Sequence, residues 1–362
     1  MSGGVDSSVA AALLKRAGVD ELRSSSRFAN ARVFDVSGVF MKLNNFSSEA
    51  ERRARKVAKI LKIPFYVFNF EKEFKKKIVD CFLKEYKAGR TPNPCVVCNK
   101  EIKFGLLLEK ALRLNADFVA TGHYAKIKKI EYRKQKIEYK LLKGRDKNKD
   151  QSYFLWQLNQ KQLKHVLFPV GDYTKGDVRK LAKKFKLPVF EAPESMEVCF
   201  IQTTINDFLK KYLKEKTGNI VDKENKVLGR HKGLWFYTIG QRKGIGLSGG
   251  PYYVLSKDFE KNLLIVTKNK RDLFKKELIT KEVNWISGKE PRLRQCFDGQ
   301  AKLPLKIKAK IRYHHNPASA TIYKIQDTRY KILFDQPQPA ITPGQSVVFY
   351  SGQELLGGGV IR

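Results

Sequence analysis

Hydrophobic and polar positions follow two alternating periods along the first half of the chain, which predicts a parallel β-sheet flanked by helices. Apolar residues recur at helical spacing in some segments, and short aromatic and β-branched runs lie between them. One such run, Pro64–Phe70, predicts a buried strand. Ile78, Phe82 and Tyr86 share a helical face, with Cys81 expected on or near it as a core residue. The predicted strands span residues 33–40, 64–70 and 118–121, and the predicted helices span 48–61, 74–86, 106–114 and 174–186. Residues 125–142 predict a charged hairpin.

The pattern changes near residue 205. Residues 205–270 mix one helix with short strands and contain a basic turn, Gly240–Gly246, which suits either a hairpin or a phosphate contact. Residues 275–362 are short alternating strands broken by glycine and proline, a pattern typical of a small β-barrel. The sequence therefore predicts three domains: an N-terminal α/β domain with a parallel sheet over 1–204, a small central α+β domain over 205–274, and a C-terminal β-barrel over 275–362.

The charge balance favours a polyanionic partner. Lysine and arginine number 72 against 36 aspartate and glutamate residues, which gives a formal net charge of +36 over 362 residues. The basic residues are spread along the whole chain, so RNA or DNA, held largely through phosphate contacts, is the expected partner. Any single lysine run, such as Lys75–Lys77, can also be explained as a solvated helix face.

Cysteine usage and hydropathy indicate a soluble protein of the cytoplasm. Five cysteines are too few and too unevenly placed for a disulfide scaffold, so reduced thiols are expected. The N-terminus lacks a signal-peptide pattern, and no apolar stretch reaches roughly 18 residues, the length that predicts a membrane span.

The first residues, Ser2–Ser8, predict a phosphate-binding loop at the start of a helix. Gly3 and Gly4 let main-chain N–H groups approach an anion, and Ser7 and Ser8 add hydroxyl donors. A Walker loop needs a lysine after its last glycine, and this chain has valine there. A loop of this other kind holds the β and γ phosphates as a leaving group, which implies adenylation. The alternative is a glycine–serine turn before an ordinary helix.

The stretch Gly89–Lys100 contains two closely spaced prolines and predicts a long irregular loop. It holds Cys95 and Cys98, while Cys199 lies far along the chain. Four interpretations are open: a zinc site with His123 as fourth ligand, a redox CxxC pair, an iron–sulfur site with three thiolates, and sulfur transfer through a persulfide. The redox interpretation is disfavoured because such a motif opens a helix, whereas this one is predicted to lie in a loop.

Several strings occur in a family-specific order: Ser2–Ser8; Gly89–Pro94 followed by Cys98–Phe104; Ala120–Tyr124; Lys149–Leu155; Leu167–Gly171; Cys199–Ile201; Thr238–Gly244; and Thr342–Tyr350. With these strings the chain resembles the tRNA-specific 2-thiouridylases, which belong to the PP-loop ATP pyrophosphatases, over nearly its whole length. The resemblance implies an N-terminal domain of the adenine nucleotide alpha hydrolase type.

The resemblance implies a tRNA-uridine 2-sulfurtransferase. Such an enzyme uses ATP with Mg²⁺ to adenylate the C2 oxygen of the wobble uridine, U34, and then replaces that oxygen with sulfur from a protein persulfide. AMP and pyrophosphate leave. The implied partners are tRNAs that accept glutamate, glutamine and lysine, together with a cysteine desulfurase or a sulfur-relay protein, and the implied state is a cytoplasmic monomer.

The resemblance also assigns roles to residues. Cys199 is expected to bear the persulfide, and Cys98 to act as the nucleophile that completes transfer through a Cys98–Cys199 disulfide. The positions expected to bind ATP are Ser2, Gly3, Gly4, Val5, Asp6, Ser7, Ser8, Met41 and Gly122. The positions expected to meet the target base are Asn93, Pro94 and Cys95, and those expected to contact the rest of the tRNA are His123, Lys149, Asp150, Gln151, Arg312, Tyr313 and Gln345.

The chain departs from the family pattern at two places. Many members have aspartate where this chain has Cys95, so the acid–base role of that carboxylate is absent, and an iron–sulfur site of Cys95, Cys98 and Cys199 becomes an alternative. The family's fold also places a central strand before the phosphate loop, which here begins at Met1. We therefore expect the printed sequence to start inside a longer protein. A Val/Ile-rich upstream segment of about five or six residues should then strengthen ATP binding and stability.

Two other functions fit parts of the sequence. An ATP-pyrophosphatase ligase or amidotransferase that adenylates a small metabolite needs the phosphate loop but neither Cys98 nor Cys199. An inactive RNA-binding relic keeps the basic surface without the chemistry. Binding of tRNA distinguishes the first from a thiouridylase, and tRNA-dependent pyrophosphate release distinguishes the second.

Overall fold

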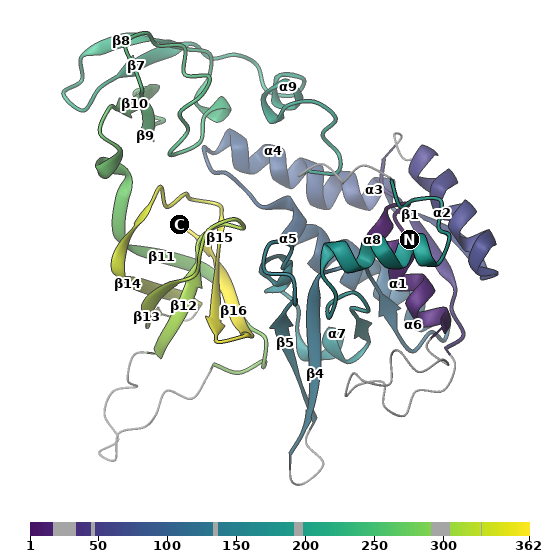
Figure 1. Ribbon diagram of the computed structural model, residues 1–362. Helices are drawn as coiled ribbons and strands as arrows, with labels where there is room; N and C mark the ends of the chain where they lie inside the picture. Colours follow the sequence, from purple (N-terminus) through teal and green to yellow (C-terminus); the bar gives the residue numbers. More distant parts are fainter. Residues whose placement is uncertain (17–33, 45–47, 133–136, 192–197, 291–304, 327) are drawn as a thin grey trace, which may run out of the picture.

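The computed structural model describes residues 1–16, 34–44, 48–132, 137–191, 198–290, 305–326 and 328–362. Three folded parts are visible in Figure 1: an N-terminal domain built from α1 to α8, a central domain of α9 and β7 to β10, and a barrel of β11 to β16. The predicted fold class, a parallel-sheet domain followed by a small central domain and a β-barrel, is confirmed.

The N-terminal domain contains two parallel strand pairs with helices around them. Strand β1 (Gly38–Lys42) pairs with β2 (Phe65–Asn69), and β3 (Val119–Ala120) pairs with β6 (Val166–Leu167). Buried apolar residues of α1 pack against α8, which places the N-terminal loop at one end of this core. The helices are α1 (Val5–Arg16), α2 (Ser48–Leu61), α3 (Glu71–Phe74), α4 (Asp80–Lys87), α5 (Pro94–Cys98), α6 (Leu107–Arg113), α7 (Gln160–Lys164) and α8 (Lys175–Lys184), with π-helical η1 (Lys75–Val79) and η2 (Asn99–Leu106) and 3₁₀-helical η4 (Ser152–Leu155).

Two predictions about burial are wrong. Strand β2 exposes Tyr66 by 53% and Val67 by 37%, because it pairs with β1 alone among the described strands and lies at a sheet edge. Cys81 is exposed, although Ile78, Phe82 and Tyr86 are buried as predicted. It precedes Phe82 by one position, and one position on a helix turns a side chain by about 100°.

The predicted loop over residues 89–100 is also wrong in its second half. Helix α5 begins at Pro94 and continues through η2 and α6 to Arg113. Proline is excluded from helix interiors but fits the first turn, where its missing N–H has no intrahelical partner. Cys95 and Cys98 therefore lie on a helix, and the argument from a loop against a redox pair does not hold.

The central domain and the barrel follow the predicted pattern. The central domain begins with α9 (Ile205–Lys210), and its sheet has the order β8-β7-β10-β9. The barrel closes through pairing of β11 with β16. The strands are β7 (Gly218–Val221), β8 (Val227–His231), β9 (Tyr253–Asp258), β10 (Leu263–Thr267), β11 (Phe274–Trp285), β12 (Leu305–Lys310), β13 (Ala318–Gln326), β14 (Arg329–Pro339), β15 (Ser346–Ser351) and β16 (Glu354–Ile361), with 3₁₀-helical η5 (Leu234–Phe236) and η6 (Lys270–Leu273).

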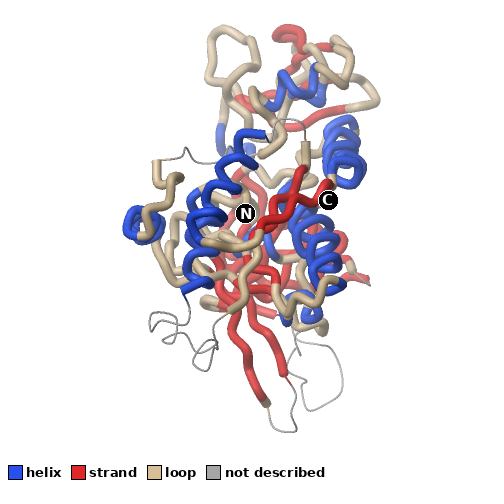
Figure 2. The backbone as a smooth tube through the Cα atoms, turned by 90° about the vertical axis from the view of Figure 1, so that its right-hand side faces the viewer, coloured by secondary structure: helices blue, strands red, loops and turns tan. Residues whose placement is uncertain are grey.

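A long hairpin joins the N-terminal domain to the barrel. It consists of β4 (Ala125–Glu131) and β5 (Ile137–Lys143), as predicted, and it projects from the body of the molecule in both views (Figures 1 and 2). Strand β5 extends the barrel sheet by pairing with β16, where Leu141 faces Leu355. No helix in the described ranges has both the length and the apolar character needed to cross a membrane.

The N-terminal domain and the barrel share a hydrophobic core around Trp156. Its side chain is fully buried, and its indole Nε1 donates to the Ser346 hydroxyl of the barrel at 3.0 Å. A Cβ at Gly358 would approach the indole to 2.8 Å, so glycine is needed there. The core includes residues of both domains, among them Leu155, Leu163, Val348, Tyr350 and Leu355.

Truncation of this indole should destabilise the joint between the domains. We expect Trp156→Ala to lower the free energy of unfolding by about 3–5 kcal/mol, because it leaves a cavity in a shared core. Leu114→Ala, at a side chain that is 64% exposed, is the control and should change the value by less than about 0.5 kcal/mol. Urea unfolding followed by circular dichroism measures both, and equal effects would contradict the assignment of this core.

Candidate functional site

The N-terminal loop has the conformation that an anion site requires. Gly3 has a positive φ of 74°, and a Cβ there would lie 2.2 Å from the Ala50 carbonyl oxygen, so only glycine fits. A Cβ at Gly4 would have only the Ser2 hydroxyl nearby, at 3.5 Å. The Ser2 amide donates to the Ser7 hydroxyl at 3.0 Å, which folds the loop over the first turn of α1. The loop thus presents main-chain N–H groups at a helix N-terminus.

Asp6 is the anchor of this loop. Its carboxylate accepts from the Lys175 ammonium at 2.7 and 2.8 Å and from the Tyr124 hydroxyl at 2.7 Å. Lys175 begins α8, and Tyr124 follows β3, so three distant segments are tied together. Sequence reasoning missed Lys175, because 169 positions separate it from Asp6.

The two other expected ATP positions lie at the carboxyl ends of parallel strands. Met41 is near the end of β1, and Gly122 follows β3. A Cβ at Gly122 would lie 2.6 Å from the Asp6 carbonyl carbon and 2.7 Å from the Ser7 amide nitrogen, so this glycine packs directly on the loop backbone. Ligands of open parallel sheets bind at this edge.

The three thiols differ in exposure. Cys98 is buried, Cys95 is half-buried and Cys199 is exposed, and none of these three described residues forms a disulfide bond. Burial raises the pKa of the Cys98 thiol to about 12 and also raises the pKa of Cys95. A charge on Cys199 raises both pKa values further, so the structure brings Cys199 into the electrostatic neighbourhood of the other two.

One cation, Lys103, opposes this effect of burial. The ammonium of Lys103 lowers the pKa of Cys95, Cys98 and Cys199 alike. Cys98 and Lys103 are five positions apart, which in an α-helix would separate them by about 140°. The π-helical hydrogen bonding of η2 links residues five apart and brings them close to one face. Sequence reasoning missed Lys103, because this face exists only in the π-helix.

His123 lies in the same neighbourhood. It is buried between the rings of Phe104 and Phe168, with centroids at 5.9 and 5.7 Å, and its Nδ1 is 2.7 Å from the Thr121 hydroxyl. Burial, and then the Lys103 charge, hold its pKa well below the usual value. His123 is therefore a neutral imidazole at pH 7.

Metal-ligating side chains do not gather into a metal centre in the described part of the chain. Among the described residues, which include Cys95, Cys98, Cys199 and His123, no three potential ligands gather closely enough to hold a metal ion. A three-thiolate iron–sulfur site and a zinc site both need such a group. Neither interpretation is supported by this arrangement of thiols.

Comparison with known proteins shows the family of this chain. The tRNA methyl transferase HUP domain model matches residues 1–203, the tRNA methyl transferase PRC-barrel domain model matches 206–268, and the aminomethyltransferase beta-barrel domain model matches 275–361. Proteins named tRNA-specific 2-thiouridylase MnmA, from Clostridioides difficile and Clostridium acetobutylicum, are each 44% identical to this chain. The alignments cover 100% of this chain and 96% and 98% of those relatives. The chain belongs to the tRNA-specific 2-thiouridylase family.

Several thiouridylase positions expected to contact tRNA make bonds within the protein. The buried Asp150 carboxylate accepts from the Gly144 amide at 3.0 Å and from the Ser152 hydroxyl at 2.9 Å. The Gln151 side chain accepts from the Tyr124 amide at 3.1 Å. These two residues hold the loop on which the half-buried Lys149 lies.

The barrel positions Arg312 and Tyr313 also make contacts within the protein. Arg312 donates to the carbonyls of Pro339 and Ala340 at 2.8 Å each, which fixes the turn that carries Tyr313. The Tyr313 ring packs on Phe154 with centroids 4.5 Å apart. The remaining positions, Asn93, Pro94 and Cys95, are half-buried at the start of α5.

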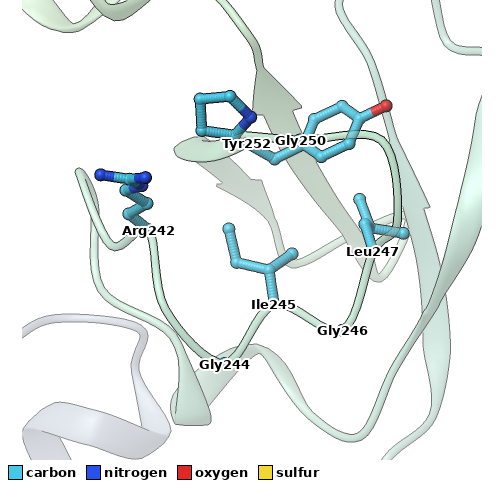
Figure 3. Close-up of a pocket in the computed structure, with 8 residues that line it drawn as sticks. Arg242, Gly244, Ile245, Gly246, Leu247, Gly250 and Tyr252 are labelled. Atoms are coloured by element: carbon cyan, nitrogen blue, oxygen red, sulfur yellow. The ribbon is translucent and has the colours of Figure 1, made fainter.

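The basic glycine turn of the central domain lines a cavity of about 350 Å³. Figure 3 shows Arg242, Ile245 and Tyr252 around it. The Lys268 ammonium lies 5.1 Å from the centre of the Tyr252 ring. An aromatic ring beside exposed cations is the combination that nucleic-acid sites use.

The role of Lys103 leads to a prediction about thiol reactivity. We expect Lys103→Met to slow alkylation of Cys98 by iodoacetamide several-fold at pH 8, because loss of the cation raises the thiol pKa and lowers the thiolate fraction. Lys100→Met, at an exposed position on the same helix, should leave the rate unchanged. Mass spectrometry of the alkylated peptide measures the rate, and an equal or faster rate in Lys103→Met would contradict the prediction.

Proposed function

We propose that this protein adenylates the C2 oxygen of the wobble uridine of tRNA and replaces it with sulfur from a persulfide on Cys199. The observation that supports this most is the position of Gly122 and His123. Gly122 packs on the phosphate loop, and its neighbour His123 shares the field of Lys103 with the thiols. Adenylation and sulfur transfer can therefore act on one bound base.

In the first step, ATP binds with its β and γ phosphates on the main-chain N–H groups of Ser2–Ser8. Mg²⁺ would be held mainly by the phosphates and water, as is usual for this ion, and would neutralise their charge. The uracil C2 oxygen attacks the α-phosphorus, and pyrophosphate leaves. The AMP ester formed is a good leaving group, whereas the original oxygen is not.

In the second step, the terminal sulfur of the Cys199 persulfide attacks C2, and AMP leaves with the C2 oxygen. The Cys98 thiolate then attacks Sγ of Cys199, and the bond between Sγ and the transferred sulfur breaks. The electron pair of that bond stays with the sulfur on C2, which becomes the thiocarbonyl. A Cys98–Cys199 disulfide forms, and an external thiol reductant must reduce it before the next turnover.

The exposure of the two thiols fits these roles. Cys199 is accessible, as a thiol must be to receive sulfur from a cysteine desulfurase or a relay protein. Cys98 is buried and largely protonated at neutral pH, which protects it from oxidation until substrate is bound. Lys103 supplies the positive charge that stabilises its thiolate when the proton leaves.

Binding of tRNA is supported by the charge of the whole chain. A formal net charge of +36 provides attraction to phosphates. U34 must leave its stack to reach a buried thiol. We propose that Asn93, Pro94 and Cys95 meet this base, and that the cavity beside Arg242 and Tyr252 contacts another part of the tRNA. We propose tRNAs for glutamate, glutamine and lysine as substrates.

The assignment of Cys199 can be tested by separating the two steps. We expect Cys199→Ser to abolish thiolation while tRNA-dependent pyrophosphate release persists, because the phosphate loop is intact and only the sulfur carrier is lost. Cys81→Ser, which removes an exposed thiol on α4, should keep both activities. Labelled sulfur that still passes from a desulfurase through Cys199→Ser to tRNA would overturn the assignment.

The assignment of the ATP site can be tested at Gly122. Gly122→Ala should weaken ATP binding by about tenfold or more, roughly 1.4 kcal/mol, because its Cβ displaces the loop backbone. Gly176→Ala is the control, since a Cβ there would meet nothing closer than 3.7 Å. Isothermal titration calorimetry with ATP measures both variants. Unchanged affinity in Gly122→Ala would place the nucleotide elsewhere.

A further inference from the structure

The segment Gly89–Asn93 connects α4 to the helix that carries the thiols. It has no regular secondary structure, so its backbone groups must find partners elsewhere. The amides of Gly89 and Arg90 donate to carbonyls of α4, and further partners come from both other domains. Because five residues of extended chain span a fixed maximum length, whatever fixes this segment also fixes the start of α5.

The barrel holds one side of the segment. The Thr91 amide donates to the Pro343 carbonyl at 2.9 Å, and the Gln345 side chain donates to the Thr91 carbonyl at 2.9 Å. Gly344 has a φ of +90°, and a Cβ there would lie 2.9 Å from the Thr91 amide nitrogen. Gln345, which the resemblance assigns to tRNA, is therefore also a support for the thiol helix.

The central domain holds the other side. The Lys257 ammonium on β9 donates to the Gly89 carbonyl at 2.9 Å and to the Tyr237 carbonyl at 2.6 Å. A Cβ at Gly89 would lie 2.2 Å from the Phe259 ring, so this side chain of the central domain packs directly on the Gly89 backbone. One ammonium thus joins a carbonyl of the N-terminal domain to a carbonyl of its own domain.

Lys257 is an unusual residue for a structural hydrogen bond, because its charged ammonium is desolvated. In the described part of the chain it makes no ion pair, and desolvation lowers its pKa to about 8. A desolvated cation without a counter-charge costs free energy that an apolar side chain would not. What the ammonium provides instead is a fixed distance between two carbonyls on different domains.

We propose that Lys257 is a positioning residue that couples tRNA docking on the central domain to the placement of Cys98. This inference rests on the proposed function. Movement of the central domain against the tRNA displaces the Gly89 carbonyl through the ammonium, and the short segment that follows passes the displacement to α5. The thiol helix then takes its reactive position only when tRNA is docked.

The test compares Lys257→Met with Lys261→Met. Both remove one cation from the β9–β10 hairpin, but Lys261 is exposed, and its amide donates to Asp258 of the same hairpin. We expect Lys257→Met to lower the single-turnover thiolation rate at saturating tRNA and ATP by about tenfold or more, since small misplacements of reacting groups have large effects on rate. The tRNA dissociation constants of the two variants should agree within about twofold, because each loses one phosphate-attracting charge. Lys257→Arg, which keeps a cationic donor, should restore most of the rate.

Alkylation of Cys98 provides a second readout that does not need the reaction. In the unsubstituted protein, tRNA should change the alkylation rate of Cys98, and in Lys257→Met this response should be lost. Should Lys257→Met fail to fold by circular dichroism, Lys257→Gln, which keeps an amide donor, replaces it and should show an intermediate response.

Two outcomes would overturn the coupling. One is a thiolation rate in folded Lys257→Met that matches Lys261→Met, and the other is an alkylation response to tRNA that is absent from the unsubstituted protein or unchanged in the variant. Failure of the proposed function has a different signature, which is absence of thiolation in the unsubstituted protein supplied with persulfide. The alkylation arm still decides the coupling in that case.

Discussion

Desolvation of the Cys98 thiol is the constraint on which the rest of the site depends. A buried thiol with a pKa of about 12 is a poor nucleophile at neutral pH, so the proposed reaction needs a positive charge close to this thiol. Lys103 supplies the charge because η2 is π-helical. Cys199 comes from a segment far along the chain. The same burial keeps His123 neutral, and among the described residues Lys103 is a cation that acts on all of these groups.

The three domains contribute to one site in different ways. The N-terminal domain provides the phosphate loop and the thiol helix; Gly122 packs on the loop, and the adjacent His123 packs against Phe104 of η2. The barrel shares a core with it around Trp156 and supports the segment before α5 through Gln345. The central domain reaches the same segment through Lys257. The three domains thus meet at the start of the thiol helix. The five-residue segment before this helix is held by hydrogen bonds from both the barrel and the central domain.

Many elements could be predicted because their periodicity is local. The hairpin 125–142, the helix over 174–186 and the barrel strands follow from patterns of neighbouring residues, and the structure confirms them. The prediction of a loop over 89–100 failed at Pro94, because proline is excluded from the interior of a helix but not from its first turn. The prediction that β2 is buried failed because strand pairing decides whether a strand lies at the edge or in the centre of a sheet, and the sequence of one strand does not encode its pairing.

The sequence alone determined the chemical groups: a glycine–serine loop without a Walker lysine, a CxxC pair, a third cysteine and an excess of positive charge. It also determined, through the order of its motifs, the family to which the chain belongs. Only the tertiary structure decided how these groups act. Three interactions join residues that are far apart in the chain: the ion pair of Asp6 with Lys175, the electrostatic interaction of Cys199 with Cys98, and the hydrogen bond from Lys257 to the Gly89 carbonyl. Such contacts, and the pKa shifts that follow from burial, depend on how distant segments pack and on how much water that packing excludes.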